Sequence, residues 1–154
     1  MKMKEFCRVL KSVFEQVIML EAYPKSQIDL QVFVLQADGG YRSAAFNAVS
    51  LALMNAGVSM KDFLAATTAG LIQNVAVVDL IYNEEKKQNC EFVAVYLQKA
   101  KKLAYISLSC NKISLSHFKS LIDLSIETCE VVALEMRKSV KKQIVANKNC
   151  FYSN

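Results

Sequence analysis

Segment 35–45 most constrains the fold, because two adjacent glycines separate a strand-like pattern from a helix-like one. Gly39 and Gly40 permit backbone conformations that are closed to other residues, and they let a ligand approach the backbone closely. The first amide groups of the helix that follows have no partners within that helix, so they can bind an anion. Arg42, in the first turn, adds a planar guanidinium that suits phosphate. The segment therefore predicts a turn that carries an anion site.

Hydrophobic spacing predicts the elements around this turn. Apolar residues at helical spacing over residues 4–20 predict a helix that ends before Pro24. Apolar side chains that recur at every second position over residues 28–34 predict a β-strand. An alanine-rich stretch over residues 41–56 predicts a helix that packs closely on a sheet, with Gly57 just beyond its end.

The second half of the chain begins with four short apolar runs. Residues 63–72 and 75–81 predict two strands, and a polar break over residues 83–89 follows them. Residues 92–97 and 103–108 predict a hairpin around a lysine-rich turn. The sequence therefore predicts four consecutive strands in this part of the chain.

A long helix is predicted over residues 116–145, with Ser114 or Ser116 as its N-cap and residues 147–154 as a frayed tail. The order helix, strand, helix, four strands, helix is typical of mixed α/β (α+β) layers. We expect one domain over residues 1–146, because a chain of 154 residues fits a single domain.

The composition favours contacts with other polypeptide chains over contacts with a membrane. Hydrophobic residues make up 53% of the chain, above the usual ~45–50%. No apolar run approaches the ~18 residues that cross a bilayer, and Arg8 and Lys11 interrupt any signal-peptide core. We therefore expect a subunit, or a piece of a larger fold, with no membrane partner.

The net charge of +5 arises entirely from Arg137 onward, where five basic residues and no acidic residue occur. This basic end could favour nucleic acid, but we prefer the interpretation that it offsets the dipole of the last helix. The five cysteines are odd in number and lack metal-site spacing, which predicts reduced, mostly buried thiols rather than disulfides or a zinc site.

Asp79 is the carboxylate with the strongest claim to a chemical role. It lies within an otherwise apolar strand, where a buried charge is costly unless it is paired or bound to a cation. It could act as a general acid or a metal ligand, or it could simply end the strand by capping a turn or pairing with a lysine.

The other polar candidates have simpler structural roles. We expect Asp38 to form an Asx-type turn, and Asp62 to cap a local turn. Glu84 and Glu85 are expected in a solvated turn, and His117, the only histidine, belongs to no catalytic triad. Tyr41 could stack on a base, although an aromatic side chain at a helix start more often packs internally.

Four segments together resemble the RNase PH family, in the order and spacing that its exosome-ring members have: residues 23–30, 34–40, 51–62, and 78–80 with 84–85. The resemblance implies an RNase PH fold (ribosomal protein S5 domain 2-like), a mixed sheet packed by helices. It covers nearly the whole chain but only part of the family domain. The amino-terminal part of that domain, with its early strands and several arginines, is absent from this chain.

The resemblance also implies roles for the residues at the turn. Gly40, Arg42 and Ser43 match the phosphate-binding positions, Arg42 and Tyr41 lie where RNA would pass, and Asp79 matches the catalytic aspartate. That aspartate is proposed to act as a general acid or to hold a divalent ion. Tyr41 replaces the usual serine or threonine, and Gln73 stands where archaeal catalytic subunits carry a second aspartate.

The function that this implies is a ring subunit of the exosome in 3′-to-5′ processing and degradation of RNA, ribosomal RNA included. We expect a structural or RNA-path role rather than a catalytic one. The implied partners are other RNase PH-type ring subunits and single-stranded RNA, and the implied location is the nucleus, nucleolus and cytoplasm. The isolated chain should self-associate, because it exposes the face on which further strands would pack.

Two alternatives remain open. The chain could be an active phosphate-dependent exoribonuclease that uses Arg42 and Asp79, with inorganic phosphate as co-substrate and Mg²⁺. It could also be a small intracellular α/β interaction domain unrelated to RNA.

Overall fold

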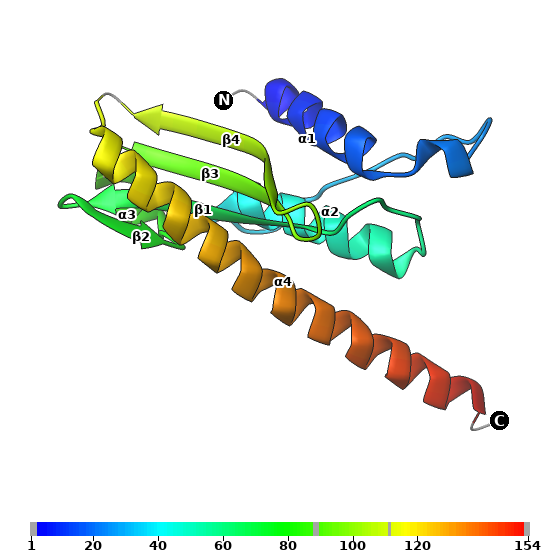
Figure 1. The fold of residues 1–154 in the computed structure, drawn as a ribbon. Coiled ribbons are helices and arrows are strands. Elements are labelled where there is room, and N and C mark those ends of the chain that lie inside the picture. The colour runs from blue at the N-terminus through cyan, green and yellow to red at the C-terminus, as the bar shows by residue number, and fades with distance from the viewer. Residues whose placement is uncertain (1–2, 88–89, 111, 153–154) are drawn as a thin grey trace.

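The computed structural model describes residues 3–87, 90–110 and 112–152, and these residues form three layers around a single sheet (Figure 1). The sheet is antiparallel with the order β2-β1-β3-β4. Helices α1 and α2 cover one face, and α4 covers the other. The mixed α/β expectation is therefore confirmed. The strands are β1 (Leu64–Ile72), β2 (Val75–Val78), β3 (Cys90–Leu97) and β4 (Lys102–Cys110).

Helices α1 (Met3–Val17) and α2 (Tyr41–Asn55) confirm the two helices predicted in the first half of the chain. Aromatic rings join them, because the Phe46 ring lies 5.8 Å from the Phe6 ring and 6.2 Å from the Phe14 ring. A short 3-10 turn, η1 (Leu20–Ala22), follows α1. Gly57 has a φ of +70° just beyond α2, as predicted for a residue that ends a helix.

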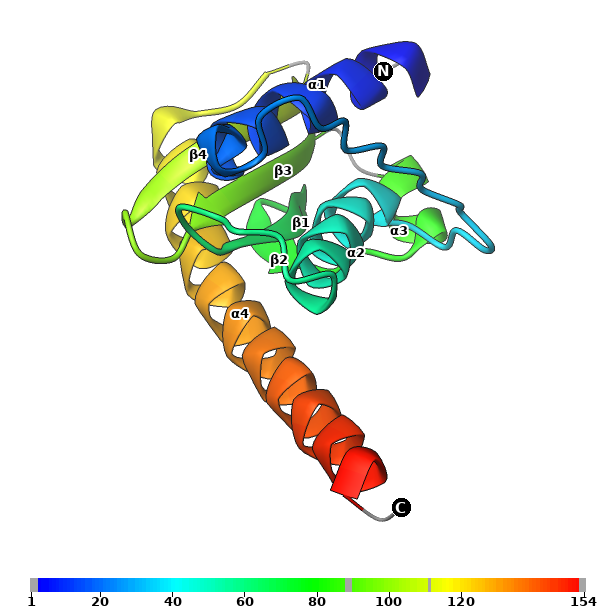
Figure 2. The same ribbon diagram turned by 90° about the vertical axis from the view of Figure 1, so that its right-hand side faces the viewer.

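Helix α4 (Leu115–Tyr152) packs on the opposite face of the sheet through its first half. Ser114 is its N-cap, since its hydroxyl accepts the backbone N–H of His117 at 3.3 Å. The far end of the helix projects beyond the sheet (Figure 2). The helix continues to Tyr152, so the predicted end at Val145 is too early and residues 147–152 are helical rather than a frayed tail. No helix in the described ranges is long and apolar enough to cross a membrane.

The predicted strand over residues 28–34 is wrong. These residues are extended, but in the described part of the chain they join no ladder. Apart from the partly buried Ile28, their apolar side chains are exposed. The exposed fraction is 78% for Phe33 and 96% for Leu35, which follows the segment. The period-two pattern fixes how side chains alternate, whereas a strand also requires backbone hydrogen bonds to a neighbour.

Two further expectations change between β1 and β3. The predicted strand 75–81 ends at Val78, because Asp79 takes a left-handed backbone with a φ of +59°. The polar stretch expected as a solvated turn contains helix α3 (Tyr82–Lys87). Glu84 caps this helix, since its carboxylate accepts the N–H of Ile81 at 3.1 Å. Residues 88–89 of that stretch lie outside the described residues.

Side chains of α2 complete the hydrogen bonding of β1. Strand β2 pairs only with residues 69–72, so the first part of β1 has no strand neighbour on that side. Asn47 fills the gap: its amide donates to the Ala66 carbonyl at 2.9 Å and accepts the Ala66 N–H at 2.7 Å. The Ser50 hydroxyl donates to the Leu64 carbonyl at 3.1 Å. These bonds fix α2, and with it the glycine turn, against the sheet.

Four of the cysteines lie in parts of the chain whose side chains are described, and all four are reduced thiols. Cys90 and Cys129 are buried, Cys110 is half-buried and Cys7 is exposed. The prediction of mostly buried thiols therefore holds for two of the four.

Candidate functional site

The glycine turn packs tightly against the segment that follows β2. Gly39 has a φ of +91°, and a Cβ atom there would lie 2.0 Å from the carbonyl oxygen of Leu80. Gly40 has a φ of +58° and is the N-cap of α2. No other residue type fits Gly39 without moving the backbone, so the two glycines bring the start of α2 next to the end of β2.

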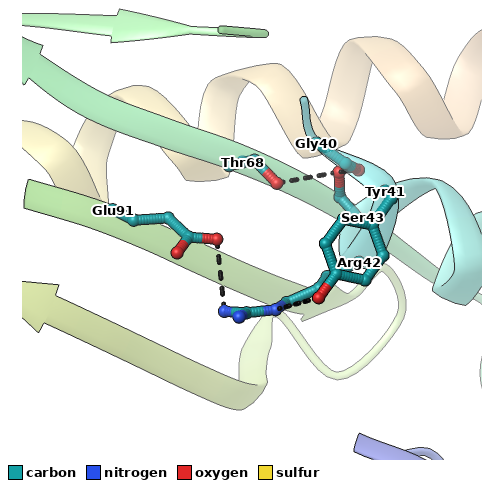
Figure 3. A network of polar contacts seen from close by, with 6 residues as sticks. All are labelled: Gly40, Tyr41, Arg42, Ser43, Thr68 and Glu91. Atoms are coloured by element: carbon teal, nitrogen blue, oxygen red, sulfur yellow. Dashed lines mark hydrogen bonds and ion pairs between the residues drawn. The ribbon is translucent and has the colours of Figure 1, made fainter. Parts of the chain in front are cut away.

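Three polar side chains meet at this point. The Ser43 hydroxyl donates to the Gly40 carbonyl at 2.8 Å, and the Thr68 hydroxyl donates to Ser43 at 2.9 Å (Figure 3). A Cβ at Gly40 would lie 4.0 Å from Oδ1 of Asp79, so the Asp79 carboxylate faces the same turn. The structure thus brings together Gly40, Ser43 and Asp79, which lie up to 39 positions apart in the sequence.

Asp79 is exposed, which corrects the expectation of a carboxylate buried in an apolar strand. It follows the last residue of β2, and its backbone N–H donates to the Thr68 carbonyl at 3.0 Å. Among the described residues it forms no ion pair. Asp79 therefore ends the strand, as one of the two sequence interpretations held, and its carboxylate remains accessible from solvent.

Arg42 points away from this cluster, toward strand β3 (Figure 3). Its Nη1 lies 3.2 Å from Oε1 of Glu91, and its Nε donates to the Tyr41 hydroxyl at 3.3 Å. The Arg42 side chain is only 13% exposed. Burial alone would lower the pKa of Arg42, but the Tyr41 hydrogen bond and the Glu91 charge outweigh it, so that the pKa is raised. The guanidinium is therefore a charged group already engaged by the protein.

Tyr41 is half-buried, and its ring contacts both helix α1 and Arg42. Its ring meets the Phe6 ring of α1 edge-on, with 6.2 Å between centroids. The same ring lies 5.6 Å from Cζ of Arg42. Helix α1 therefore fixes Tyr41, and Tyr41 in turn helps to fix Arg42.

Sequence reasoning missed Glu91. Its signal was visible, since Glu91 is the only charged residue in the apolar stretch of β3. Nothing in the sequence, however, indicates that Glu91 lies beside Arg42, because the contact spans 49 positions and depends on the layering of α2 on the sheet.

The remaining candidates have structural contacts. Asp38 accepts the N–H of Tyr82 at 3.3 Å and so ties the turn to α3. Asp62 accepts three backbone N–H groups, from Phe63, Lys99 and Ala100, and joins the start of β1 to the β3–β4 turn. Gln73 lies exposed in the β1–β2 turn, where its φ is +50°.

The donor set does not fit a resident divalent metal ion. Within the described residues, no group of three or more histidine, cysteine, aspartate or glutamate side chains could hold one. Asp79 would be a single carboxylate ligand there, and hard divalent cations take six or more oxygen ligands.

The glycine turn and helix α2 lie within a segment that matches a known protein family. A family model described as "3' exoribonuclease family, domain 1" matches residues 2–59, which include the whole glycine turn. The exosome complex component Rrp41 of Nitrosopumilus maritimus is 30% identical over 144 residues, covering 94% of this chain and 59% of the relative. Residues 2–59 match the RNase PH family, and most of the chain is similar to this exosome component.

Two further comparisons extend this similarity. The exosome complex component ski6 of Schizosaccharomyces pombe is 35% identical over 136 residues, which cover 88% of this chain and 55% of the relative. The chain thus spans a little over half the length of these relatives. The crystal structure of rice (Oryza sativa) Rrp46 has the same fold, with a TM-score of 0.83 at 21% identity over 90% of this chain and 65% of that one.

Proposed function

We propose that this chain belongs to the RNase PH family as a ring subunit of an exosome complex, where it supports 3′-to-5′ RNA processing and degradation without catalysing phosphorolysis. The relatives named as exosome components support the complex. The observation that carries the non-catalytic role is the engagement of Arg42 by Glu91 and Tyr41. Phosphorolysis requires phosphate beside the scissile bond, and the one guanidinium at this turn is already bound.

A second candidate is an active phosphate-dependent exoribonuclease. The convergence of Gly40, Ser43 and the exposed Asp79 favours it, because a helix start and a nearby acid could serve phosphate and the leaving 3′ oxygen. Inorganic phosphate would then be the co-substrate. The Mg²⁺ expected for that activity would need ligands from RNA, phosphate or other subunits, because Asp79 alone offers one carboxylate.

Release of nucleoside diphosphates separates the two candidates. Single-stranded RNA and inorganic phosphate are incubated with the chain, both alone and co-expressed with RNase PH-type ring subunits. We expect no diphosphate release from this chain's site. Release that Asp79→Asn abolishes, while the ring still assembles, would establish the catalytic alternative.

The proposed partners fit an apolar groove between α1 and the extended segment. The groove has a volume of about 940 Å³. Alternate residues of the segment, Leu30, Val32 and Val34, line it together with Phe6 and Leu10 of α1. An extended segment with open backbone groups and an apolar lining suits a strand of another subunit. The isolated chain should use the same edge to bind a second copy of itself.

Sedimentation of the chain tests this surface. We expect dimers or larger species, and we expect Val32→Asp with Val34→Asp to shift them toward monomer, because both side chains line the groove and are 40% and 50% exposed. Leu115→Asp is the control, since Leu115 is 83% exposed at the start of α4 and outside the groove. A wild-type chain that sediments as a monomer at micromolar concentration would contradict the self-association.

Co-purification tests the complex itself. We expect the tagged chain to recover RNase PH-type ring subunits and single-stranded RNA from the nucleus, nucleolus and cytoplasm, the compartments in which we place it. Recovery of neither would favour the small interaction domain instead.

A further inference from the structure

The Arg42–Glu91 pair has a consequence for ligand binding at the turn. Arginine has five N–H donors, and the two nitrogens Nη1 and Nε of Arg42 already face oxygens of Glu91 and Tyr41. A carboxylate and a phosphate offer the same chemistry to a guanidinium, namely negatively charged oxygens in a fork geometry. Glu91 therefore stands where an oxyanion bound to Arg42 would place its oxygens.

Glu91 is well placed to hold this position. Its backbone pairs with Gly70 of β1 on one side and with Ser109 of β4 on the other, so its carboxylate is mounted on the sheet rather than on a loop. The side chains of Glu91 and Arg42 are 30% and 13% exposed, so water screens their attraction less than it screens a surface pair. The remaining ion pairs among the described residues, such as Lys101–Glu130, are more exposed.

We propose that Glu91 is a built-in competitor for oxyanions at Arg42, and that it lowers the affinity of this site for inorganic phosphate and for the phosphates of RNA. The inference rests on the proposed role of the turn as the family's phosphate site. An oxyanion that binds Nη1 and Nη2 together, in fork geometry, must displace Glu91 from Nη1. Its apparent affinity is therefore reduced in proportion to the fraction of chains in which Arg42 is released from Glu91. Tyr41, held by Phe6, adds to the cost of that release because it binds Nε.

Glu91→Gln tests the proposal, because glutamine keeps the length of the side chain and removes its charge. Binding is measured by calorimetry with two probes, inorganic phosphate and a short single-stranded RNA with a free 3′ hydroxyl. We expect Glu91→Gln to tighten binding of at least one probe about tenfold, equivalent to ~1.4 kcal/mol. Glu130→Gln is the matched control, since it removes the carboxylate of an exposed pair and should change either affinity less than twofold.

The double variant Glu91→Gln with Arg42→Gln shows whether the gain depends on Arg42. The gain should disappear in it. A gain confined to phosphate assigns the site to the inorganic ion, a gain confined to RNA assigns it to the nucleic acid backbone, and an equal gain assigns it to both. If Glu91→Gln does not fold, Glu91→Asp replaces it: the shorter side chain weakens the 3.2 Å contact and should give a smaller gain.

Unchanged affinity for both probes in a folded Glu91 variant would overturn the proposal, as would a gain that survives loss of Arg42. Co-purification of the wild-type chain with ring subunits is scored separately. A chain that joins the ring but shows no gain refutes the role of Glu91 alone, whereas a chain that shows the gain but joins no ring refutes the proposed complex alone.

Discussion

The double hydrogen bond of Asn47 to strand β1 allows a quantitative test of how the site is built. Asn47→Ala removes both the acceptor of the Ala66 N–H and the donor to the Ala66 carbonyl. Ala66 is only 2% exposed, and β2 does not extend far enough to replace Asn47. An unsatisfied buried backbone group costs about 1–3 kcal/mol. Two such groups, the Ala66 N–H and carbonyl, would cost about 2–6 kcal/mol. Because Asn47 is half-buried and water can enter where its side chain was, we expect a loss of unfolding free energy in the lower half of this range, about 3 kcal/mol.

Asn55→Ala on the same helix is the matched control. It makes the same chemical change in the same helix, although at the last helical residue, where the gain in helix propensity is smaller. Its only described side-chain bond, from its amide to Gln143 at 3.1 Å, is exposed. We expect this variant to lie within about 0.5 kcal/mol of the wild-type chain.

Thermal and urea unfolding, followed by circular dichroism at fixed protein concentration, measures the difference. A loss of about 3 kcal/mol in a chain of this size lowers the midpoint of thermal unfolding by roughly 6–12 °C. Asn47→Asp should fall between the two, because it keeps the acceptor for the Ala66 N–H but sets a carboxylate oxygen against the Ala66 carbonyl. If Asn47→Ala is as stable as Asn55→Ala, then α2 is not held through these bonds and the reasoning is refuted.

Two further predictions concern the turn and the core. Gly39→Ala should destabilise the chain several times more than Gly57→Ala. Both glycines have a positive φ, but only a Cβ at Gly39 would collide with the Leu80 carbonyl. Equal losses of stability in urea unfolding would contradict this. Burial raises the pKa of the Cys129 thiol from its ordinary value near 9 to about 12, so between these pH values the unfolded chain loses a proton that the folded chain keeps. Stability should therefore fall by up to ~1.4 kcal/mol per pH unit in that window and be unaffected below it. Cys129→Ala should remove this loss of stability at alkaline pH, whereas Cys7→Ala, at an exposed cysteine, should keep it. If urea unfolding shows the same pH dependence of unfolding free energy for both variants, Cys129 makes no such contribution.

The sequence was sufficient for elements whose partners are local. The helical spacing before Pro24, the glycine beyond α2 and the lysine-rich hairpin turn each depend on neighbouring residues, and each was predicted in the correct place. Residues 28–34 show the limit of this reasoning. Their alternation is real, since one face lines the groove beside α1, yet without a neighbouring strand it produces only an extended segment.

The site shows the same limit. The local motif placed Gly40, Arg42 and Ser43 at the start of a helix, and the structure has them there. Arg42 contacts Glu91 of β3, and Asn47 holds α2 against Ala66 of β1. Both contacts depend on how the helices pack on the sheet. A lone charge within an apolar strand was the visible signal for Glu91, but no local pattern names its partner.

The two acidic groups at the turn also impose an order on ligand binding. Asp79 faces the start of α2, so an oxyanion that enters there meets a carboxylate on one side and gains only the helix amides on the other. Arg42 could offset that repulsion, but only after its guanidinium leaves Glu91 and turns toward the cluster at Ser43. Release of Arg42 must therefore precede tight binding rather than follow it. Removing Asp79 should then help an anion even while Glu91 is intact, whereas removing Glu91 should help only a chain that retains Arg42.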